Sequence, residues 1–370
     1  MVYWADGRAF GGRAVTVFVA PKEWDPDQDD RLVCQAVFDE TRDIRTFVFA
    51  APEPRRFRYD AGQFINIEVD IGGETHVRSY TLSSSPTRPE RVAISVKRIP
   101  GGIVSGHLHD HLKPGDALTV SGPLGEFSTA RAPAKKYLFL SAGVGITPLI
   151  AMARAAHDRA ETSDILFLHC TRDADDIAFH AELELIARRS PAFHPAYAVS
   201  AMTNPSEPGR IAGRLTFEGL QAICSDLAER EIFCCGPEGF MAAIRDGLKS
   251  AGLGAARYHE ESFTFSEPDQ PETNEATGLP TAPQVFQVTF AKRGQVISCA
   301  PDTTILAATR LAGIPLPSSC AKGLCGTCKS RKISGEVEMK HQGGIRQREI
   351  ENGLVLLCCS KPLSDVTIDR

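Results

Sequence analysis

Apolar and polar side chains alternate along residues 65–71 and 92–96. A period of two is typical of strands that turn one face to a core and the other to water, as in an antiparallel sheet or small barrel. Turns rich in glycine and proline, such as Gly72-Gly73 and Pro114-Gly115-Asp116, separate these stretches. The pattern predicts an antiparallel β-barrel domain over residues 34–132.

The pattern changes after residue 133. Short apolar runs at residues 137–142, 165–170 and 231–235 are each followed by a helix-like segment. Continuous apolar strands that alternate with helices indicate a parallel sheet covered on both faces. We therefore predict an α/β parallel-sheet domain over residues 133–265.

Two segments lack a core of their own. Residues 266–283 are predicted to be a linker, since these 18 positions contain four prolines, four acidic residues and no lysine or arginine. Residues 1–33 form an N-terminal extension, for which the sequence suggests only packing onto a neighbouring surface. The protein is thus expected to be multidomain, with three folded units.

The third unit, residues 284–370, carries apolar strands and one short helix. The helix is predicted near residues 304–312, with Asp302 or Thr303 as its N-cap and Gly313 as its stop.

Composition narrows the class of protein. The 370 residues are 42% hydrophobic and 24% charged, the balance of an ordinary globular protein, and the net charge of −5 argues against nucleic acid as the main partner. The longest apolar segment, residues 137–153, contains two glycines, a serine, a threonine and a proline, so it indicates a buried strand, turn and helix, not a membrane span.

Eleven cysteines are the outlier of the composition, and five of them fall within the last 51 residues. The number is odd, and the first 30 residues show no secretory signal. We therefore expect a reducing compartment, the cytoplasm, with cysteine used as a metal ligand and not in disulfides.

The strongest motif is the spacing C-x4-C-x2-C of Cys320, Cys325 and Cys328, with Cys358 following after 29 residues. This is the plant-type spacing for a [2Fe–2S] cluster, in which one loop supplies three thiolates and a separate strand the fourth. Zinc is the alternative, but only one C-x2-C pair is present. Cys359 is a second candidate for the fourth ligand. We choose Cys358 because the stretch resembles the ferredoxin pattern, in which an apolar strand precedes that ligand.

A second motif, Arg78-Ser79-Tyr80-Thr81, follows an alternating strand. Residues i and i+2 of a strand share a face, so Arg78 and Tyr80 point together. The motif resembles the flavin signature of the ferredoxin–NADP reductase superfamily. The resemblance implies that Tyr80 packs on the flavin ring, that Arg78 neutralises a flavin phosphate and that Thr81 forms a hydrogen bond near the reactive nitrogen.

A glycine-rich turn before a predicted helix resembles the same family's phosphate loop, where glycines allow close approach of an anion to a helix N-terminus. The loop suits the dinucleotide FAD better than FMN. The residues implied in flavin binding are Arg78, Ser79, Tyr80, Thr81, Val96, Lys97, Gly102, Val104 and Ser105.

The parallel-sheet domain carries the superfamily's version of a nicotinamide-dinucleotide loop, with Thr-Pro in place of the third Rossmann glycine. The Cys-Gly-Pro motif after a later strand implies that Cys235 lies beside the nicotinamide and is the catalytic residue. Arg172 could bind the 2′-phosphate of NADPH, or it could contact the pyrophosphate, with Asp173, Asp175 and Asp176 making a further phosphate unfavourable nearby. The resemblance favours NADH. The other residues implied in nucleotide or flavin binding are Gly143, Gly145, Thr147, Pro148, Arg172, Gly236, Pro237 and Phe263.

The domain order flavin, nucleotide, ferredoxin resembles the reductases of Rieske oxygenases and of hybrid cluster protein. Residues 43–49, 80–88 and 96–109 look most like reductase subunits of glycine betaine and related quaternary-ammonium monooxygenases. The expected fold is therefore an antiparallel β-barrel flavin domain, an α/β parallel-sheet nucleotide domain and a C-terminal β-grasp plant-type ferredoxin domain.

The expected function is an NADH-dependent reductase that passes electrons through FAD and a [2Fe–2S] cluster to a Rieske-type oxygenase. No chain segment indicates nucleic acid or a membrane as a partner. One alternative is a reductase of another redox protein, such as hybrid cluster protein. An alternative of another class is an iron–sulfur redox sensor without turnover.

Charge suggests how the third unit docks. Residues 284–370 hold 12 basic and 7 acidic residues, a net charge of +5, while the rest of the chain carries −10. Opposite fields favour docking on the flavin half and on an acidic partner. The residues expected to line that docking face are Lys322, Lys329, Arg331 and Lys332.

Several polar clusters are interpreted as structural. His107, His109 and His111 are assigned to a helix after the phosphate loop, not to a metal site. The acidic residues interpreted as solvated faces are Glu182, Glu184, Glu260 and Glu261.

Overall fold

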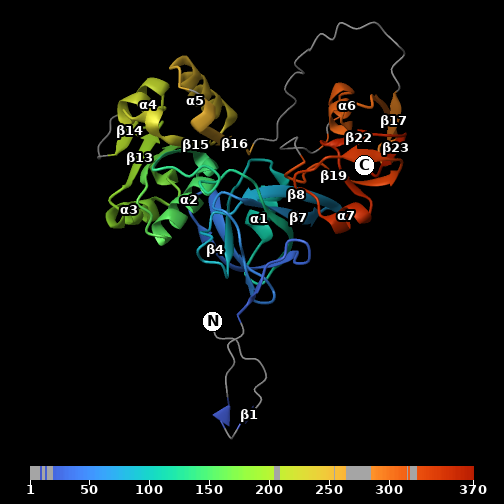
Figure 1. Cartoon of the computed structure of the whole chain (residues 1–370), viewed down its shortest axis with the longest axis horizontal. Helices are drawn as coiled ribbons and strands as arrows, with labels where there is room; N and C mark the ends of the chain where they lie inside the picture. The colour runs from blue at the N-terminus through green and yellow to red at the C-terminus, as the bar shows by residue number, and fades with distance from the viewer. Residues whose placement is uncertain are drawn as a thin grey trace.

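Three folded units make up the chain, with the barrel between the parallel-sheet domain and the C-terminal domain (Figure 1). The structure is a computed structural model, and it describes residues 9–10, 13–14, 20–203, 209–253, 255–263, 285–314, 316 and 323–370. The predicted linker and part of the N-terminal extension, residues 1–8, 11–12 and 15–19, lie outside the described residues.

The first unit is a six-stranded antiparallel sheet in the order β8-β7-β10-β4-β5-β9. A bridge between Leu82, just after β8, and Ile94 of β9 joins its two outer strands and closes the sheet into a barrel. The apolar positions of the alternating stretches point inward, and Phe47 and Ile67 are fully buried. The strands are β4 (Arg31–Asp39), β5 (Ile44–Ala50), β7 (Phe64–Ile71), β8 (Glu74–Thr81), β9 (Val92–Lys97) and β10 (Ala117–Leu124).

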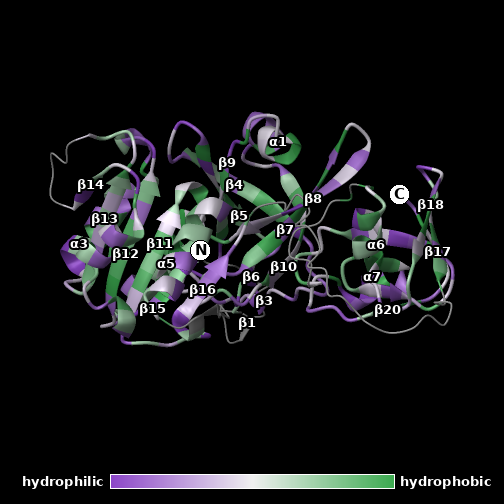
Figure 2. Cartoon of the chain, turned by 90° about the horizontal axis from the view of Figure 1, so that it is seen from above, coloured by the Kyte–Doolittle hydropathy of each residue, from purple (hydrophilic) through white to green (hydrophobic). Residues whose placement is uncertain are grey.

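The second unit is a six-stranded parallel sheet in the order β14-β13-β12-β11-β15-β16. Its central strands are apolar along their length (Figure 2), as expected for a sheet covered by helices. The strands are β11 (Lys136–Ala142), β12 (Asp164–Thr171), β13 (Phe193–Val199), β14 (Arg210–Ala212), β15 (Glu231–Cys235) and β16 (Tyr258–Glu261). The helices are α2 (Ile146–Asp158), α3 (His180–Arg189), α4 (Phe217–Ile223) and α5 (Glu238–Ser250).

The third unit is a mixed sheet in the order β18-β17-β23-β19-β21, with β17 parallel to β23. It confirms the predicted β-grasp fold. The strands are β17 (Phe286–Phe290), β18 (Gln295–Cys299), β19 (Lys329–Ser334), β20 (Val337–Met339), β21 (Leu354–Leu356), β22 (Ser360–Pro362) and β23 (Val366–Ile368). The helices are α6 (Ile305–Leu311) and α7 (Gln347–Glu351).

The predicted N-cap of α6 is wrong by one residue. The Thr304 hydroxyl, not Asp302 or Thr303, accepts a hydrogen bond from the Ala307 amide at 3.3 Å. Threonine in this position satisfies an amide that the first turn leaves unpaired. Gly313, with φ of +69°, follows the end of the helix as predicted.

Arg154 of α2 joins the barrel to the parallel-sheet domain. Its guanidinium donates to the Ser83 carbonyl of the barrel at 2.5 Å and to both carboxylate oxygens of Glu182. It also lies 4.9 Å from the ring centre of Phe179. Glu182 is therefore part of this junction, and its interpretation as a solvated face is wrong.

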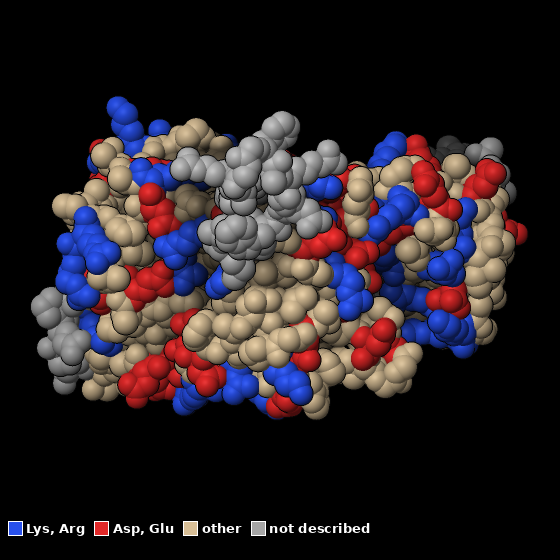
Figure 3. Space-filling view, turned by 90° about the horizontal axis from the view of Figure 1, so that it is seen from below, with Lys and Arg blue, Asp and Glu red and all other residues tan. Residues whose placement is uncertain are grey.

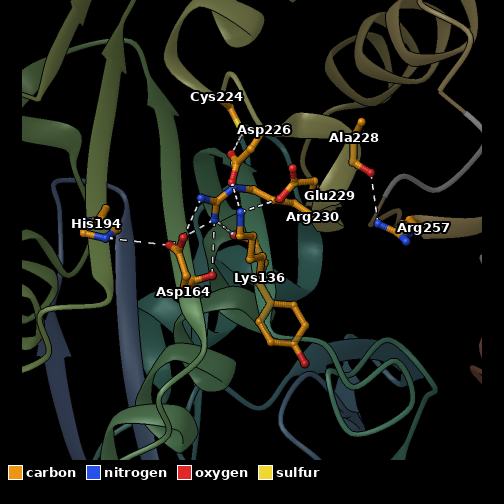
Figure 4. Close-up of polar contacts among 10 residues, drawn as sticks. Lys136, Asp164, His194, Cys224, Asp226, Ala228, Glu229, Arg230 and Arg257 are labelled. Carbon is orange, nitrogen blue, oxygen red and sulfur yellow. Dashed lines mark hydrogen bonds and ion pairs between the residues drawn. The ribbon is translucent and has the colours of Figure 1, made fainter.

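Arg230 holds together the amino ends of three strands of the parallel sheet (Figure 4). Its side chain is 8% exposed, and it binds Asp164 at 2.9 Å, Asp226 at 2.7 Å and the Tyr137 carbonyl at 3.0 Å. Hydrogen bonds from Arg230 and Lys136 hold the pKa of Asp226 well below its usual range, although burial opposes them. The network joins the amino ends of strands β11, β12 and β15. It thereby also fixes the relative positions of their carboxyl ends, on the opposite side of the sheet.

We expect Arg230→Met to lower the free energy of unfolding by about 3 kcal/mol, because Asp164 loses its arginine partner and Asp226 keeps only Lys136. Chemical denaturation followed by circular dichroism measures the change. Arg257→Met is the matched control, since Arg257 is exposed and donates to the Ala228 main-chain carbonyl. Equal losses in the two variants would contradict the role given to Arg230.

Candidate functional site

The two faces of strands β7 and β8 carry different residues of the site. Cross-strand pairs share a face, and the register pairs Ile67 with Arg78 and Ile65 with Tyr80. Arg78 and Tyr80 therefore lie on the side of the barrel core, as the i, i+2 spacing predicts. Ser79 lies on the opposite side, where its hydroxyl donates to the Asn66 carboxamide oxygen at 2.8 Å.

The motif on β8 fits a bound flavin. The Thr81 hydroxyl oxygen is buried and has no hydrogen-bond partner among the described residues, so a ligand atom could satisfy it. Burial raises the pKa of Tyr80 and keeps its ring neutral against the barrel core. Burial lowers the pKa of Arg78, which fits a cation that an anionic ligand stabilises.

The predicted phosphate loop precedes helix α1 (Ile103–His111). A Cβ on Gly102 would stand 2.6 Å from the Ser105 hydroxyl oxygen, so this position requires glycine. Val96 and Val104 are 1% and 2% exposed, and their side chains belong to the barrel core. Their place in a flavin site is therefore limited to their main chain.

His109 is structural, as predicted. Its ring Nε2 hydrogen-bonds the Val96 carbonyl at 2.8 Å and ties α1 to β9. His107 and His111 lie on one face of the helix, with ring centres 4.8 Å apart and ring planes tilted by 51°.

The nucleotide loop lies where the strand order of the parallel sheet reverses. The chain runs from β11 outward to β14 and then returns to β15 on the other side of β11. Ligands of open α/β sheets bind at this reversal, beyond the carboxyl ends of the strands. Gly143 and Gly145 follow β11, and Cys235 and Gly236 end β15 at the same place.

Glycine is required at position 145. A Cβ there would overlap the Cys235 carbonyl oxygen and stand 2.7 Å from the Gly236 nitrogen. A Cβ on Gly236 would in turn stand 2.9 Å from the Ala142 Cβ. The two loops therefore meet main chain to main chain, beside the N-terminus of α2, which attracts an anion. Thr147 donates to the Val144 carbonyl at 3.1 Å, and Pro148 is buried in the first turn.

Cys235 is fully buried, and burial, with Glu261 nearby, raises the pKa of its thiol well above the usual range. The register places Cys235 beside Glu261 of β16. Burial raises the pKa of Glu261 to about 8, and its Oε2 has no hydrogen-bond partner among the described residues. The interpretation of Glu261 as a solvated residue is therefore wrong, whereas Glu260 is partly exposed and pairs with Arg245.

A buried pair at the same edge has no signal in the sequence. His169 at the end of β12 is fully buried and shares a hydrogen bond of 2.8 Å with Ser141 of β11. Burial lowers the pKa of His169 to about 3, so the ring is neutral. Its second nitrogen has no partner among the described residues. Only the strand register brings these two residues together, so local pattern could not identify them.

Arg172 follows β12 and its side chain is 82% exposed, 4.0 Å from Asp173. Arg42 of the barrel binds Asp173 at 3.2 Å and Asp176 at 2.6 Å, so these acids also join the two domains. Phe263 packs against the core of the parallel-sheet domain, at the end of the chain segment that follows β16.

The cysteine loop is described from residue 323 onward, so Cys320 lies outside the described residues. Cys325, Cys328 and Cys358 are all less than 8% exposed. The Cys358 amide donates to the Cys328 sulfur at 3.4 Å, and the Gly323 amide donates to the Cys358 sulfur at 3.2 Å. Amides directed at sulfur favour thiolates and fit an iron–sulfur cluster.

Cys359 is oriented differently from Cys358. It is partly exposed, and its sulfur contacts the Leu356 carbonyl at 3.6 Å. This favours Cys358 as the fourth ligand. Without Cys320, the described residues hold no group of three or more cysteine, histidine or acidic side chains placed for a metal.

The described cysteine loop packs on the barrel. A Cβ on Gly326 would stand 3.3 Å from the Asn66 amide nitrogen, and one on Gly343 would stand 3.3 Å from Leu124. Lys329 is 8% exposed and lies 3.5 Å from Glu68 of β7 and 2.7 Å from Glu349. The cysteine loop, below also called the cluster loop, therefore contacts the outer face of β7. The partner of β7 in the sheet, β8, carries the flavin motif.

The predicted docking face is correct in part. Lys329 meets the flavin half, and Arg331 lies beside it at a cavity between the two domains. Lys332 donates to the Gly335 carbonyl of its own domain at 2.6 Å. Lys322 lies outside the described residues.

These three sites on three folds define a pyridine-nucleotide oxidoreductase that uses a flavin and an iron–sulfur cluster. The chain matches an oxidoreductase FAD-binding domain at residues 33–129, an oxidoreductase NAD-binding domain at residues 139–246 and a 2Fe-2S iron–sulfur cluster binding domain at residues 288–363. Within the described residues, no helix has the length and apolar character needed to cross a membrane.

Similar proteins cover almost the whole chain. It is 43% identical over 344 residues to the glycine betaine monooxygenase reductase subunit of Pseudomonas aeruginosa, covering 91% of this chain and 94% of that protein. It is 38% identical to the stachydrine N-demethylase reductase subunit of Rhizobium meliloti, covering 91% and 96%. Phthalate dioxygenase reductase, described as modular for electron transfer from pyridine nucleotides to [2Fe–2S], superposes with a TM-score of 0.57 at 26% identity, over 93% and 98% of the chains.

The chain therefore belongs to the family of ferredoxin reductase-type flavin and iron–sulfur reductases that includes these monooxygenase reductase subunits. Its cofactors are FAD, a [2Fe–2S] cluster and a nicotinamide dinucleotide.

We expect Gly145→Ala to slow reduction of the flavin by the nicotinamide nucleotide at least about tenfold, because a Cβ separates the two loops that meet there. Stopped-flow absorbance measures this rate. Gly239→Ala is the matched control, since its Cβ meets nothing within 4 Å. An unchanged rate in Gly145→Ala would contradict the close approach of these loops.

Glu261 gives the stability a pH dependence. The folded protein keeps Glu261 protonated up to about pH 8, whereas the unfolded chain ionises it near pH 4.5. Glu261 thus makes stability fall as pH rises between these values, by at most about 1.4 kcal/mol per unit. We expect Glu261→Gln to flatten this fall in denaturation curves measured from pH 5 to 8. Parallel curves for the two proteins would argue against a protonated Glu261.

Proposed function

We propose that this chain passes electrons from NADH, through FAD and a [2Fe–2S] cluster, to a Rieske-type oxygenase that demethylates glycine betaine or a related quaternary ammonium compound. The likeness to reductase subunits of glycine betaine and stachydrine demethylation supports the substrate class. The observation that carries the proposal is the packing of the cysteine loop on the strand pair that bears the flavin motif. We place this activity in the cytoplasm because the odd number of cysteines and their cluster spacing favour a reducing compartment.

The flavin would be held at the barrel. We assign ring packing to Tyr80, a hydrogen bond to Thr81 and charge neutralisation to Arg78. Ser79 acts through Asn66 and not through direct contact. The residues assigned to the rest of the flavin are Lys97, Gly102 and Ser105, together with the main chain of Val96 and Val104.

The nucleotide would be held at the strand reversal. Main-chain amides around Gly143, Gly145 and Gly236 receive its phosphates, and Cys235 stands beside the nicotinamide as a neutral thiol. The residues assigned to orientation of the nucleotide are Thr147, Pro148, Pro237 and Phe263. When bound, FAD supplies the conversion from two-electron to one-electron transfer: it accepts two electrons as a hydride and releases them singly, because the cluster accepts one electron at a time.

The preference for NADH rests on charge. Asp173 and Asp176 follow Arg172 in the same turn. The carboxylates of both form ion pairs with Arg42. A further phosphate on the ribose would meet Asp175, which is exposed at the same turn. An NADPH preference in steady-state kinetics would overturn this assignment.

The partner is tested by reconstitution. Purified protein, a Rieske oxygenase and glycine betaine are mixed with NADH, and formaldehyde release is measured. We expect turnover only with all components present. Electron transfer to hybrid cluster protein, without transfer to the oxygenase, would contradict the proposal.

The fourth cluster ligand is tested by a pair of adjacent cysteines. We expect Cys358→Ser to lose cluster absorption and cytochrome c reduction, while NADH still reduces ferricyanide through the flavin. Cys359→Ser is the matched control and keeps both activities, because the Gly323 amide donates to the Cys358 sulfur, whereas the Cys359 sulfur donates to the Leu356 carbonyl. The reverse pattern would assign Cys359 as the ligand.

A further inference from the structure

The N-terminal extension, which the sequence left without a role, is built into the barrel over residues 22–30, here called the strap. Trp24 is 7% exposed, its indole donates to the Gly122 carbonyl at 3.0 Å, and its ring lies 5.0 Å from Phe57. Strand β3 (Lys22–Glu23) pairs in parallel with β6 (Arg55–Arg56). The strap is therefore a fixed part of the barrel wall.

The acidic end of the strap is held in place by a second set of contacts. The Arg55 guanidinium binds the Asp29 carboxylate at 3.0 Å, with both side chains less than a fifth exposed. The Asp30 carbonyl accepts from the Val120 amide of β10 at 2.8 Å. Asp29 and Asp30 are thus positioned by the barrel before anything docks on them.

The strap presents two groups to the C-terminal domain. The Asp30 carboxylate binds Arg348 of α7 at 2.8 Å. The Asp29 carbonyl accepts from Arg346 at 3.4 Å, and the Val120 carbonyl accepts from the same guanidinium at 2.8 Å. Arg346 and Arg348 therefore bind both the strap and the neighbouring strand β10.

Arg346 is the most enclosed group of this contact. It is 9% exposed, its Nε has no partner among the described residues, and burial beside Arg348 lowers its pKa. Its guanidinium bonds are to main-chain carbonyls, so burying the cation is costly without a negative field. Asp30 and Glu68 are the barrel carboxylates that supply this field.

The junction is polar and accessible to water. A cavity of about 300 Å³ lies between the domains, and its charged lining comes from both sides, as Asp30, Glu68, Arg331, Arg346, Arg348 and Glu349. The Asp30 and Arg348 side chains are 38% and 42% exposed, so salt screens their attraction. Lysine and arginine gather on this side of the molecule over the C-terminal domain (Figure 3). Such a contact holds the domain in place without locking it.

We propose that the strap is a latch that positions the C-terminal domain on the barrel, with Asp30 as the receptor for Arg348 and the Asp29 and Val120 carbonyls as the receptors for Arg346. The latch sets the fraction of molecules in which the cluster loop lies against β7. It acts on electron transfer from flavin to cluster and not on reduction of the flavin by the nucleotide. The nucleotide loops belong to the parallel-sheet domain, which lies on the other side of the barrel (Figure 1).

The test reverses one exposed charge in the cofactor-loaded full chain. We expect Asp30→Arg to slow cluster reduction, followed by stopped-flow after anaerobic mixing with NADH, by about fivefold at low salt. The rate of flavin reduction stays unchanged. In small-angle scattering the radius of gyration increases, because a larger fraction of C-terminal domains leaves the barrel. This second readout does not depend on turnover.

The charge swap separates a latch from a general structural effect. We expect Asp30→Arg combined with Arg348→Asp to restore both the rate of cluster reduction and the radius of gyration. Lys292→Glu is the matched control, since it reverses a 69% exposed cation that pairs with Asp369 inside the same domain. Unchanged cluster reduction and scattering in Asp30→Arg, or no recovery in the swap, would overturn the proposal.

Discussion

The register of β7 against β8 is the constraint on which the electron path depends. It turns Arg78 and Tyr80 toward the barrel core and Ser79 toward the opposite face. Asn66 accepts a hydrogen bond from Ser79 on that face and also stands beside Gly326 of the cysteine loop. A slip of one residue would move the flavin motif to the wrong face. A single pair of strands therefore places Arg78 and Tyr80 on one face and the cysteine loop against the other, and keeps them adjacent.

The barrel makes two junctions of different character. Toward the parallel-sheet domain, the largely buried Arg154 donates to the Ser83 carbonyl of the barrel, and Arg42 of the barrel, whose side chain is 66% exposed, binds two carboxylates. Toward the C-terminal domain, the contacts include partly exposed ion pairs and a cavity. Hydride transfer needs a fixed approach of two rings, whereas a domain that serves both flavin and an outside acceptor must release its contacts.

Local pattern predicted the three folds and most motif positions, because alternation, glycine turns and cysteine spacing are local signals. The missed features depend on distant residues. Glu261 looked solvated beside Glu260 but is only partly exposed, with one carboxylate oxygen buried, because β16 pairs with β15. The His169–Ser141 pair arises from strand register, and the strap's role arises from arginines more than 300 positions away. The N-cap of α6 was misplaced because three consecutive polar residues could each have capped it.

The central claim is that the cluster loop sits on the outer face of β7, opposite the flavin motif. A crystal structure of the oxidised, cofactor-loaded protein at low salt tests it most directly. The account predicts flavin against Tyr80 and Thr81, a cluster enclosed by the cysteine loop, and intact contacts from Lys329 to Glu68 and from Arg346 to the Val120 carbonyl. A cluster loop resting on the parallel-sheet domain, or a flavin that does not contact Tyr80, would contradict it.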